Sequence, residues 1–449
     1  MFYKPTLHRF TALSLAASIT LSLGACATNS TAPAPTQAAN QDQQFTIAVI
    51  PDTQNYLDYT HQKAEGFPFD ANEMFITQMQ YIADNLEIAG GDIAFVTSLG
   101  DVWQHQTLMM DPEHKERGFK RAPNPLLDAH FAPTDKVKTV EMPKAHEGFS
   151  LIAGKVPFSV VPGNHDYDAM WTDSQFPPAS QFNPKDISSI GTLHPGGLTN
   201  FRSVFGADTK FFKDKPWYVS SHDGGADSAQ IFSAGGYQFL HIGLQFDPPN
   251  DTLAWAADVI KQHPGLPTIV STHDYLNTDG RRQANAIIDG HKVDPIHNSA
   301  EMVWDKFIAK HDQIFLVLCG HQHGQATRMD DNDFGNPVWQ LLSDYQGRHQ
   351  VSKDAGVEMK DYPIEIGDGW MRFLTFDMSG DVPEIRVRTY STHYQIDSAD
   401  HAQYAEWYKH HEQPHMNDEQ FNAADHFNVK LIDFKKRFGR NELTAQTQK

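Results

Sequence analysis

The sequence predicts an α/β fold, in which short buried strands alternate with amphipathic helices. Short apolar runs are separated by segments whose apolar residues recur at helical spacing. Five of these runs end in Asp, Asn or His, and several of those residues stand beside Gly. Hydrophobic residues make up 40% of the 449 residues and charged residues 20%, so the chain has enough apolar surface to bury a core.

The predicted elements begin with a strand and a helix, and strands then dominate. The first strand covers 45–51, and the helix at 72–87 carries Phe75, Met79 and Ile82 on one face. Further strands are predicted at 93–99, 158–161, 239–244, 268–272 and 314–319. Helices are predicted at 251–263 and 301–310. Three later segments also have strand-like patterns: 338–342, 370–377 and 384–390.

Potential ligand side chains follow five of the strands. They are Asp52 with Gln54, Asp101, Asn164 with His165, His273, and His321 with His323. In open α/β sheets, ligands bind beyond the carboxyl ends of the strands, so we expect these side chains to converge. Each strand end alone is also consistent with an ordinary turn, because Gly-Asp and Asn-His are common loop residues. Five such ends in series, with His-x-His at the last, favour a site.

The donors in this series are carboxylates, amide oxygens and imidazoles, without a thiolate. Such a set suits divalent ions of Mn, Fe, Zn or Co and does not choose among them. Two metal ions about 3.5–4 Å apart need a bridging ligand, and a carboxylate serves best. Asp101 stands in the middle of the series and is the natural bridge.

Taken together, these motifs resemble those of the calcineurin-like metallophosphoesterases. The family pattern is Asp-x-His, Gly-Asp, Gly-Asn-His-Asp/Glu, a single His, and Gly-His-x-His. The corresponding segments here are Asp52-Thr-Gln54, Gly100-Asp101, Gly163-Asn-His-Asp166, His273 and Gly320-His-Gln-His323. The resemblance implies a two-sheet β-sandwich flanked by helices, an α/β/β/α arrangement.

The resemblance also implies a reaction and a set of roles. It implies a dinuclear metal-dependent phosphoesterase, in which a metal-bridging hydroxide attacks a phosphate mono- or diester. His165 and Asp101 would be the catalytic residues, with His165 acting at the leaving-group oxygen. One metal would be held by Asp52, Gln54, Asp101 and His323, and the other by Asp101, Asn164, His273 and His321. A non-catalytic metal-binding or protein-binding module on the same scaffold is the alternative.

Two departures from the family pattern bear on the substrate. Gln54 stands where many members carry His, which replaces an imidazole ligand by a neutral oxygen. In the protein Ser/Thr phosphatase branch, a second Asp orients the catalytic His, whereas Gln104 stands at that position here. This difference argues against protein dephosphorylation as the specialised role.

Three further residues are candidate substrate contacts. The segments Pro51–Gln54 and Asp344–Gln346 resemble the Pro-Asp-Thr-Gln and Asp-Tyr-Gln motifs of exported bacterial members. Tyr345 is therefore either a pocket residue or part of the core, and the two interpretations have equal weight. Arg281 and Arg282 follow His273 and could either bind a phosphate oxygen or form a solvated pair.

Two long segments, 104–155 and 168–220, follow strand ends that carry predicted ligands. Segments of this length in a compact enzyme are usually lids or specificity insertions, so both could cover the site. Surface elaborations without substrate contact are the alternative.

The first residues of the sequence indicate export. Residues 1–25 have a basic start and a short apolar run, and Leu23-Gly-Ala-Cys26 resembles a lipoprotein acylation site. We therefore expect lipidation at Cys26, a flexible tether at 26–44, a catalytic domain at 45–395 and a polar C-terminal extension at 396–449. The expected location is the bacterial cell envelope, on the periplasmic or outer-membrane face in a Gram-negative cell. The net charge of -20 argues against a stable nucleic-acid partner.

Overall fold

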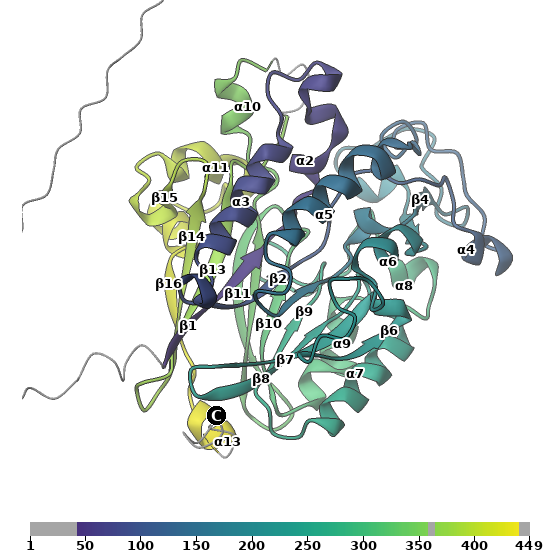
Figure 1. Cartoon of the computed structure of the whole chain (residues 1–449). Helices are drawn as coiled ribbons and strands as arrows, with labels where there is room; N and C mark the ends of the chain where they lie inside the picture. The colour runs from purple at the N-terminus through teal and green to yellow at the C-terminus, as the bar shows by residue number, and fades with distance from the viewer. Residues whose placement is uncertain (1–42, 358–363, 440–449) are drawn as a thin grey trace, which may run out of the picture.

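The computed structural model describes residues 43–357 and 364–439 (Figure 1). Two large sheets pack face to face, and helices cover their outer faces. The predicted α/β/β/α sandwich is therefore confirmed. The expected signal peptide, most of the tether and Cys26 lie outside the described residues.

The first sheet has the strand order β15-β14-β13-β1-β2-β3, with β16 paired to β14. Its strands are β1 (Gln44–Ile50), β2 (Ile93–Ser98), β3 (Phe158–Val160), β13 (Trp370–Asp377), β14 (Glu384–Ser391), β15 (Ile396–Asp397) and β16 (Phe427–Lys430). Strands β1, β2 and β3 run parallel, so their carboxyl ends lie at one edge of the sheet. Strand β13 pairs antiparallel with β1.

The second sheet has the order β11-β12-β10-β9-β8-β7-β6. Its strands are β6 (Tyr218–His222), β7 (Asp227–Ala234), β8 (Tyr237–Gly243), β9 (Thr268–Ser271), β10 (Ile314–Cys319), β11 (Gly324–Asp331) and β12 (Pro337–Asp344). Strands β8, β9, β10 and β12 are parallel. The sequence patterns did not identify β6, β7 and β11, because polar residues interrupt their apolar alternation.

Strand β1 shows how the sequence divides the core. Phe45, Ile47 and Val49 face the second sheet, whereas Ala48 and Ile50 face the helices on the outer side. This alternation follows from the two-residue period of a strand. Because both faces of β1 are buried, successive residues from Ile47 to Ile50 are apolar, and the strand appears in the sequence as an apolar run.

Helices cover the outer faces of both sheets, and the three predicted helices, at 72–87, 251–263 and 301–310, are among them. The first sheet is covered by α2 (Gln54–Leu57), α3 (Asn72–Asp84), α5 (Met142–Ser150) and α6 (Thr199–Phe205). The second is covered by α7 (Asn250–Gln262) and α9 (Ala300–Lys306). Predicted helices 72–87 and 301–310 thus end earlier than expected, and each is followed by a short 3-10 turn. None of the helices among the described residues is long and apolar enough to cross a membrane.

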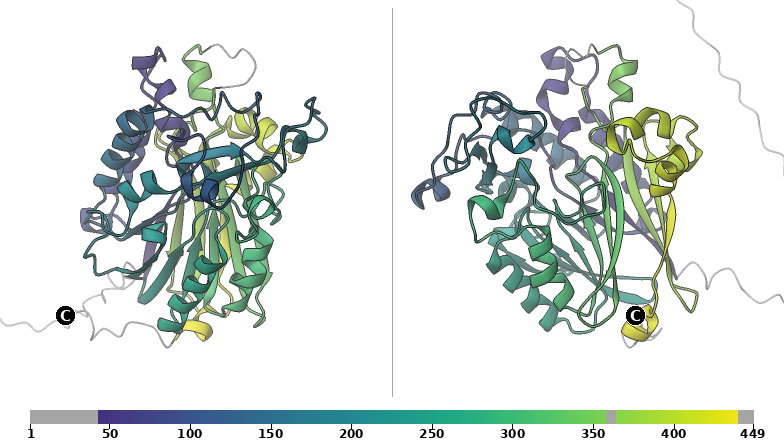
Figure 2. Two further views of the ribbon diagram at one scale, coloured as in Figure 1. Left: turned by 90° about the vertical axis from the view of Figure 1, so that its right-hand side faces the viewer. Right: turned by 180° about the vertical axis from the view of Figure 1, so that it is seen from behind.

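The two insertions contain secondary structure and contact one another. Segment 104–155 carries α4 (Pro112–Glu116) and α5, and segment 168–220 carries β4 (Ala169–Thr172), β5 (Leu193–Gly196) and α6. A third segment, 277–299, carries α8 (Gly290–Val293). Figures 1 and 2 place α4, β4 and α8 on the same side of the molecule. Bridges between single residues join the three segments: Leu108 to Ala169, Arg121 to Asp173, and Leu193 to Ile288.

The region set apart as a polar C-terminal extension packs onto the sandwich. It carries α11 (Tyr404–Glu412), α12 (Asp418–Ala424), β16 and α13 (Phe434–Phe438), and a further short helix, α10 (Gln350–Asp354), precedes it. Strand β16 extends the first sheet, and Phe434 and Phe438 enter the core between the sheets. Widely spaced aromatic residues in a polar sequence give little periodic signal, although a few of them suffice to attach a segment.

Candidate metal centre

Predicted ligands from both sheets meet around the carboxylate of Asp101. Gln54 Nε2 donates a hydrogen bond to Asp101 Oδ2 at 3.1 Å. His273 Nε2 lies 3.3 Å from Asp101 Oδ1 and 4.0 Å from Asp52 Oδ2. All four side chains are buried. Asp101 is therefore in contact with ligands on both sides of the site, as a bridging carboxylate requires.

Asn164 and His321 complete this group. His273 Nε2 lies 3.1 Å from Asn164 Oδ1 and 3.1 Å from His321 Nδ1. The structure thus brings together the six residues that we call the strand-end cluster: Asp52, Gln54, Asp101, Asn164, His273 and His321. His323, the seventh predicted ligand, lies at the rim. Its side chain is 43% exposed and its Nδ1 is 3.8 Å from Glu365.

The strand topology explains why these residues converge. In the first sheet, Asp52, Asp101 and Asn164 follow the parallel strands β1, β2 and β3. In the second sheet, His273 and His321 follow the parallel strands β9 and β10. Because the carboxyl ends of parallel strands share an edge, each sheet presents its ligands on the same side.

Glycines at the strand ends allow the ligands to approach each other. A Cβ on Gly163 would lie 2.2 Å from Asp101 Oδ1, and a Cβ on Gly320 would lie 2.2 Å from Asp52 Oδ1. Any side chain at these two positions would displace a carboxylate, so the glycines of the motifs are sterically required.

Asp166 holds two of the strand-end loops together. Its carboxylate accepts hydrogen bonds from the backbone N–H groups of Val102 and Gly163, each at 2.9 Å. The backbone N–H of His165 donates to Asp101 Oδ1 at 2.8 Å. The carboxylate of Asp101 is therefore oriented by a hydrogen bond from the neighbouring loop.

The electrostatics of the cluster favour a bound cation. Burial raises the pKa of Asp52, and the charge of Asp344 raises it further. Burial would also raise the pKa of Asp101, but His273 and His165 together hold it below its usual value. Burial and the neighbouring His273 lower the pKa of His321 to about 3. Burial would lower the pKa of His273, but the carboxylates of Asp101 and Asp52 outweigh burial and raise it, so a cation that bound there would replace the proton of this ring. A neutral imidazole is the form that binds metals, and a divalent cation would stabilise both carboxylates as anions.

One buried atom indicates directly that the site suits a metal ion. Gln54 Oε1 is buried and has no hydrogen-bond partner, whereas its Nε2 is satisfied by Asp101. A buried amide oxygen without a partner costs about 1–3 kcal/mol. Coordination of a cation by this oxygen would remove that cost. The residues present therefore fit divalent metal ions.

His165 is oriented by the backbone rather than by a carboxylate. Its Nδ1 lies 2.7 Å from the carbonyl oxygen of Gln104. Donation from Nδ1–H to this carbonyl places the free lone pair or a second proton on Nε2. Gln104 stands where the Ser/Thr phosphatase branch carries the orienting Asp. Here the backbone carbonyl of Gln104, and not a side-chain carboxylate, accepts the hydrogen bond that orients the His165 ring.

Some residues at the site gave a weak signal or none in the sequence. Gln346 Nε2 donates to Asp52 Oδ2 at 3.3 Å, and Asn285 Nδ2 lies 3.0 Å from His321 Nε2. Tyr345 points away from the site, and its hydroxyl donates to Asp425 at 2.7 Å within a buried network. The alternation of side chains could have identified Gln346, because it follows Tyr345 at the end of β12. Asn285 lies in a loop without any motif.

The two arginines occupy different environments. Arg282 is buried, and its guanidinium donates to Gln340 at 2.6 Å and Asp330 at 2.7 Å. It also stacks over Trp304, with its central carbon 4.2 Å from the ring centroid. Arg282 is therefore part of a structural network and not of a solvated pair. The side chain of Arg281 is 69% exposed.

A two-sheet sandwich with carboxylate, amide and imidazole donors at its strand ends defines the metallophosphoesterase class of folds. Residues 45–325 match the model of the calcineurin-like phosphoesterase family, and the chain belongs to that family. The chain is also similar to a protein of Bacillus subtilis (strain 168) described as uncharacterized protein YvnB, with 24% identity over 353 residues. That match covers 77% of this chain and 20% of the relative, so the chain spans about a fifth of its length.

Proposed function

We propose that this chain is a dinuclear metal-dependent phosphoesterase that hydrolyses phosphate mono- or diesters. The observation that carries the proposal is the convergence of six predicted ligands on one buried site, where Gln54 Oε1 lacks any partner. Membership of the calcineurin-like family supports the same reaction class.

The ligand roles follow the pattern of the family. Asp52, Gln54, Asp101 and His323 would hold one divalent ion of the Mn, Fe or Zn type. Asp101, Asn164, His273 and His321 would hold the other. When bound, such ions act as Lewis acids on the phosphoryl oxygens and lower the pKa of bound water. His323 would reach its ion by a change of rotamer, since its side chain is the exposed one in the set.

His165 would act at the leaving group. Its Nδ1–H donates to the Gln104 carbonyl, which fixes the plane of the ring and the tautomer. Nε2 is then the atom that can deliver a proton to the departing oxygen. Arg282 cannot serve as a phosphate clamp in this arrangement, because its donors are engaged by Glu301, Asp330 and Gln340. Arg281 remains the candidate for a weak contact with substrate.

The proposal is tested by metal analysis of the full chain together with hydrolysis of one phosphomonoester and one phosphodiester reporter. We expect activity after loading with Mn, Fe or Zn, and a loss of at least about a hundredfold in Asn164→Ala. His415→Ala is the matched control, since His415 is exposed. Full activity of Asn164→Ala would refute the ligand assignment. Full metal loading without hydrolysis of either reporter would favour the non-catalytic binding module.

We also propose that the chain is exported and lipid-anchored at Cys26, which would hold the catalytic domain at the bacterial cell envelope. The basic start, the apolar run and the small residues before Cys26 support this proposal. Cys26→Ser should release the protein from the membrane fraction, whereas Cys319→Ser should not, since Cys319 is buried in β10. Unchanged membrane association of Cys26→Ser would contradict the anchor.

A further inference from the structure

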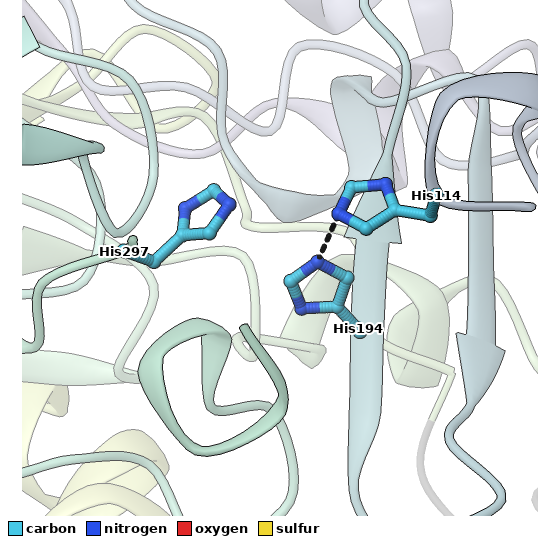
Figure 3. A group of neighbouring side chains, drawn as sticks. All are labelled: His114, His194 and His297. Carbon is cyan, nitrogen blue, oxygen red and sulfur yellow. Dashed lines mark hydrogen bonds between the residues drawn. The ribbon is translucent and has the colours of Figure 1, made fainter. Parts of the chain in front are cut away.

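A second group of buried imidazoles lies outside the strand-end cluster. His114, His194 and His297, which we call the three-histidine cluster, are all buried and each offers a ring nitrogen within 4.8 Å of the others. His114 Nε2 and His194 Nε2 are 2.9 Å apart. Figure 3 shows the three rings directed toward a common centre, with the contact between His114 and His194 as a dashed line.

Each histidine of this cluster comes from a different segment. His114 lies on α4 in the first insertion, His194 on β5 in the second, and His297 in the loop that follows α8. No local motif joins them, because 80 residues separate His114 from His194. The cluster therefore exists only through the packing of the three segments against one another.

The hydrogen bonds around the cluster set the ring tautomers. His114 Nδ1 lies 3.0 Å from the carboxylate of Asp111, and His297 Nδ1 lies 2.7 Å from the carbonyl oxygen of Asp247. Each Nδ1 must donate to such an acceptor, so each Nε2 carries a lone pair. Donation of the far ring N–H to a carboxylate or carbonyl is the arrangement found around metal-bound histidines.

His194 presents the unsatisfied atom. It is fully buried, and its Nδ1 has no hydrogen-bond partner. If His194 Nε2–H donates to His114, a lone pair on Nδ1 stays buried without a donor. A cation between the three rings would instead bind Nε2 of His194 together with Nε2 of His114 and His297, and the proton of His194 would then lie on Nδ1, which has no acceptor in the structure.

A carboxylate and a pocket lie next to the three-histidine cluster. Oδ2 of Asp294 lies 3.7 Å from His114 Nε2 and 2.6 Å from Arg117 Nη2, so a metal ion that used this oxygen as a fourth donor would share it with Arg117. A pocket of about 650 Å³ is lined by His114 and His297 among other residues and gives an entry path. Three imidazoles with one oxygen donor form a ligand set that suits tetrahedral zinc.

We propose that His114, His194 and His297 form a third metal site, separate from the strand-end cluster, which binds a zinc-type divalent cation and fastens the three segments together. In tetrahedral zinc sites with a metal–nitrogen distance of about 2.0–2.1 Å, ligand nitrogens lie about 3.3 Å apart. The two Nε2 atoms of His114 and His194 are 2.9 Å apart and the nitrogen of His297 lies within 4.8 Å of both, so binding requires the rings to move to that common spacing. The ion would thus hold the two insertions and segment 277–299 in one arrangement. That segment contains Asn285, which contacts His321 of the strand-end cluster.

The test measures zinc bound to the full chain, and it does not depend on hydrolysis. The full chain is loaded with zinc alone, separated from free metal, and analysed for zinc per chain. We expect His194→Gln and His297→Gln each to lose one zinc per chain relative to wild type. His241→Gln is the matched control, because His241 is equally buried but both its ring nitrogens have partners. Unchanged zinc content in both cluster variants would overturn the proposal.

A second measurement covers the case in which the cluster variants do not fold. The full chain with Asp52→Ala and His273→Ala, which damage the strand-end cluster, is loaded with zinc and examined by X-ray absorption at the zinc edge. A coordination shell with about three imidazoles would support the site. Absence of bound zinc, or a shell of oxygen donors alone, would leave the three rings as a hydrogen-bonded network and refute the proposal.

Discussion

The strand-end cluster and the three-histidine cluster differ in donors and in origin. The first combines two carboxylates, two amide side chains and two imidazoles at the ends of strands. The second contains imidazoles that come from three loops or short elements. Mixed oxygen and nitrogen donors suit two reactive metal ions that share a bridge. A set dominated by imidazole suits one ion that is held tightly.

The clusters also differ in what holds them in place. Hydrogen bonds from backbone N–H groups to Asp101 and Asp166 fix the strand-end cluster within the sheets. Contacts between insertions position the three-histidine cluster, for example the bridge of Leu193 to Ile288. The first cluster is thus held by the ends of the strands themselves, whereas the second depends on contacts between segments that lie outside the sheets.

The largest expected effect on hydrolysis is that of replacing His165, and it should leave the bound metal unchanged. His165→Ala should reduce hydrolysis of the reporters by about 100- to 10,000-fold, because it removes the group proposed to protonate the leaving oxygen. Its metal content should equal that of wild type, since the ring is bonded to Gln104 and not to the cluster. The measurement pairs kcat with metal analysis. Loss of metal along with activity would place His165 among the ligands.

An intermediate effect on zinc affinity is expected from Asp111, whose carboxylate is hydrogen-bonded to His114. Asp111→Asn should weaken zinc binding at the three-histidine cluster by about 10- to 100-fold, because the carboxylate fixes the His114 tautomer. Asn keeps the hydrogen bond that Asp111 accepts from the backbone N–H of His114 at the start of α4. Competition with a chelator measures the affinity, and Asp279→Asn is the exposed control. Unchanged affinity would show that Asp111 only caps the helix.

The smallest expected effect uses a buried histidine that binds no metal. His241 is bonded to Gln230 at 2.8 Å and Ser271 at 2.9 Å, and burial lowers its pKa to about 3. Because this pKa lies below the value near 6.5 in the unfolded chain, its contribution to stability is complete above about pH 6.5 and falls as the pH drops toward 3.

Urea unfolding near neutral pH and near pH 5 should therefore reveal a loss of at most about 2 kcal/mol in wild type that His241→Gln lacks. Zinc content should be the same in both proteins. An identical pH dependence of the two unfolding free energies would mean that His241 titrates normally in the fold. A loss of zinc in His241→Gln would show that a buried histidine whose ring nitrogens are both hydrogen-bonded also affects zinc binding, and the three-histidine cluster would then not be distinguished from other buried histidines.

The sequence by itself determined the fold class and located the residues of the strand-end cluster. Apolar runs predict β1, β2, β3, β9 and β10, and the first polar residue after each run marks where the strand ends. Since parallel strands of one sheet end at a common edge, a residue that directly follows a strand is placed by topology alone. For Tyr345 the sequence left a pocket residue and a core residue equally open, and the structure shows its side chain in the buried network around Asp425.

Only the tertiary structure decided the rest. The packing of segments distant in sequence united His114, His194 and His297, buried Arg282 against Asp330, and brought the Gln104 carbonyl to His165. None of these contacts leaves a local pattern. Periodicity reports the face and the end of a single element, whereas contacts between loops depend on where each element is carried by the whole chain.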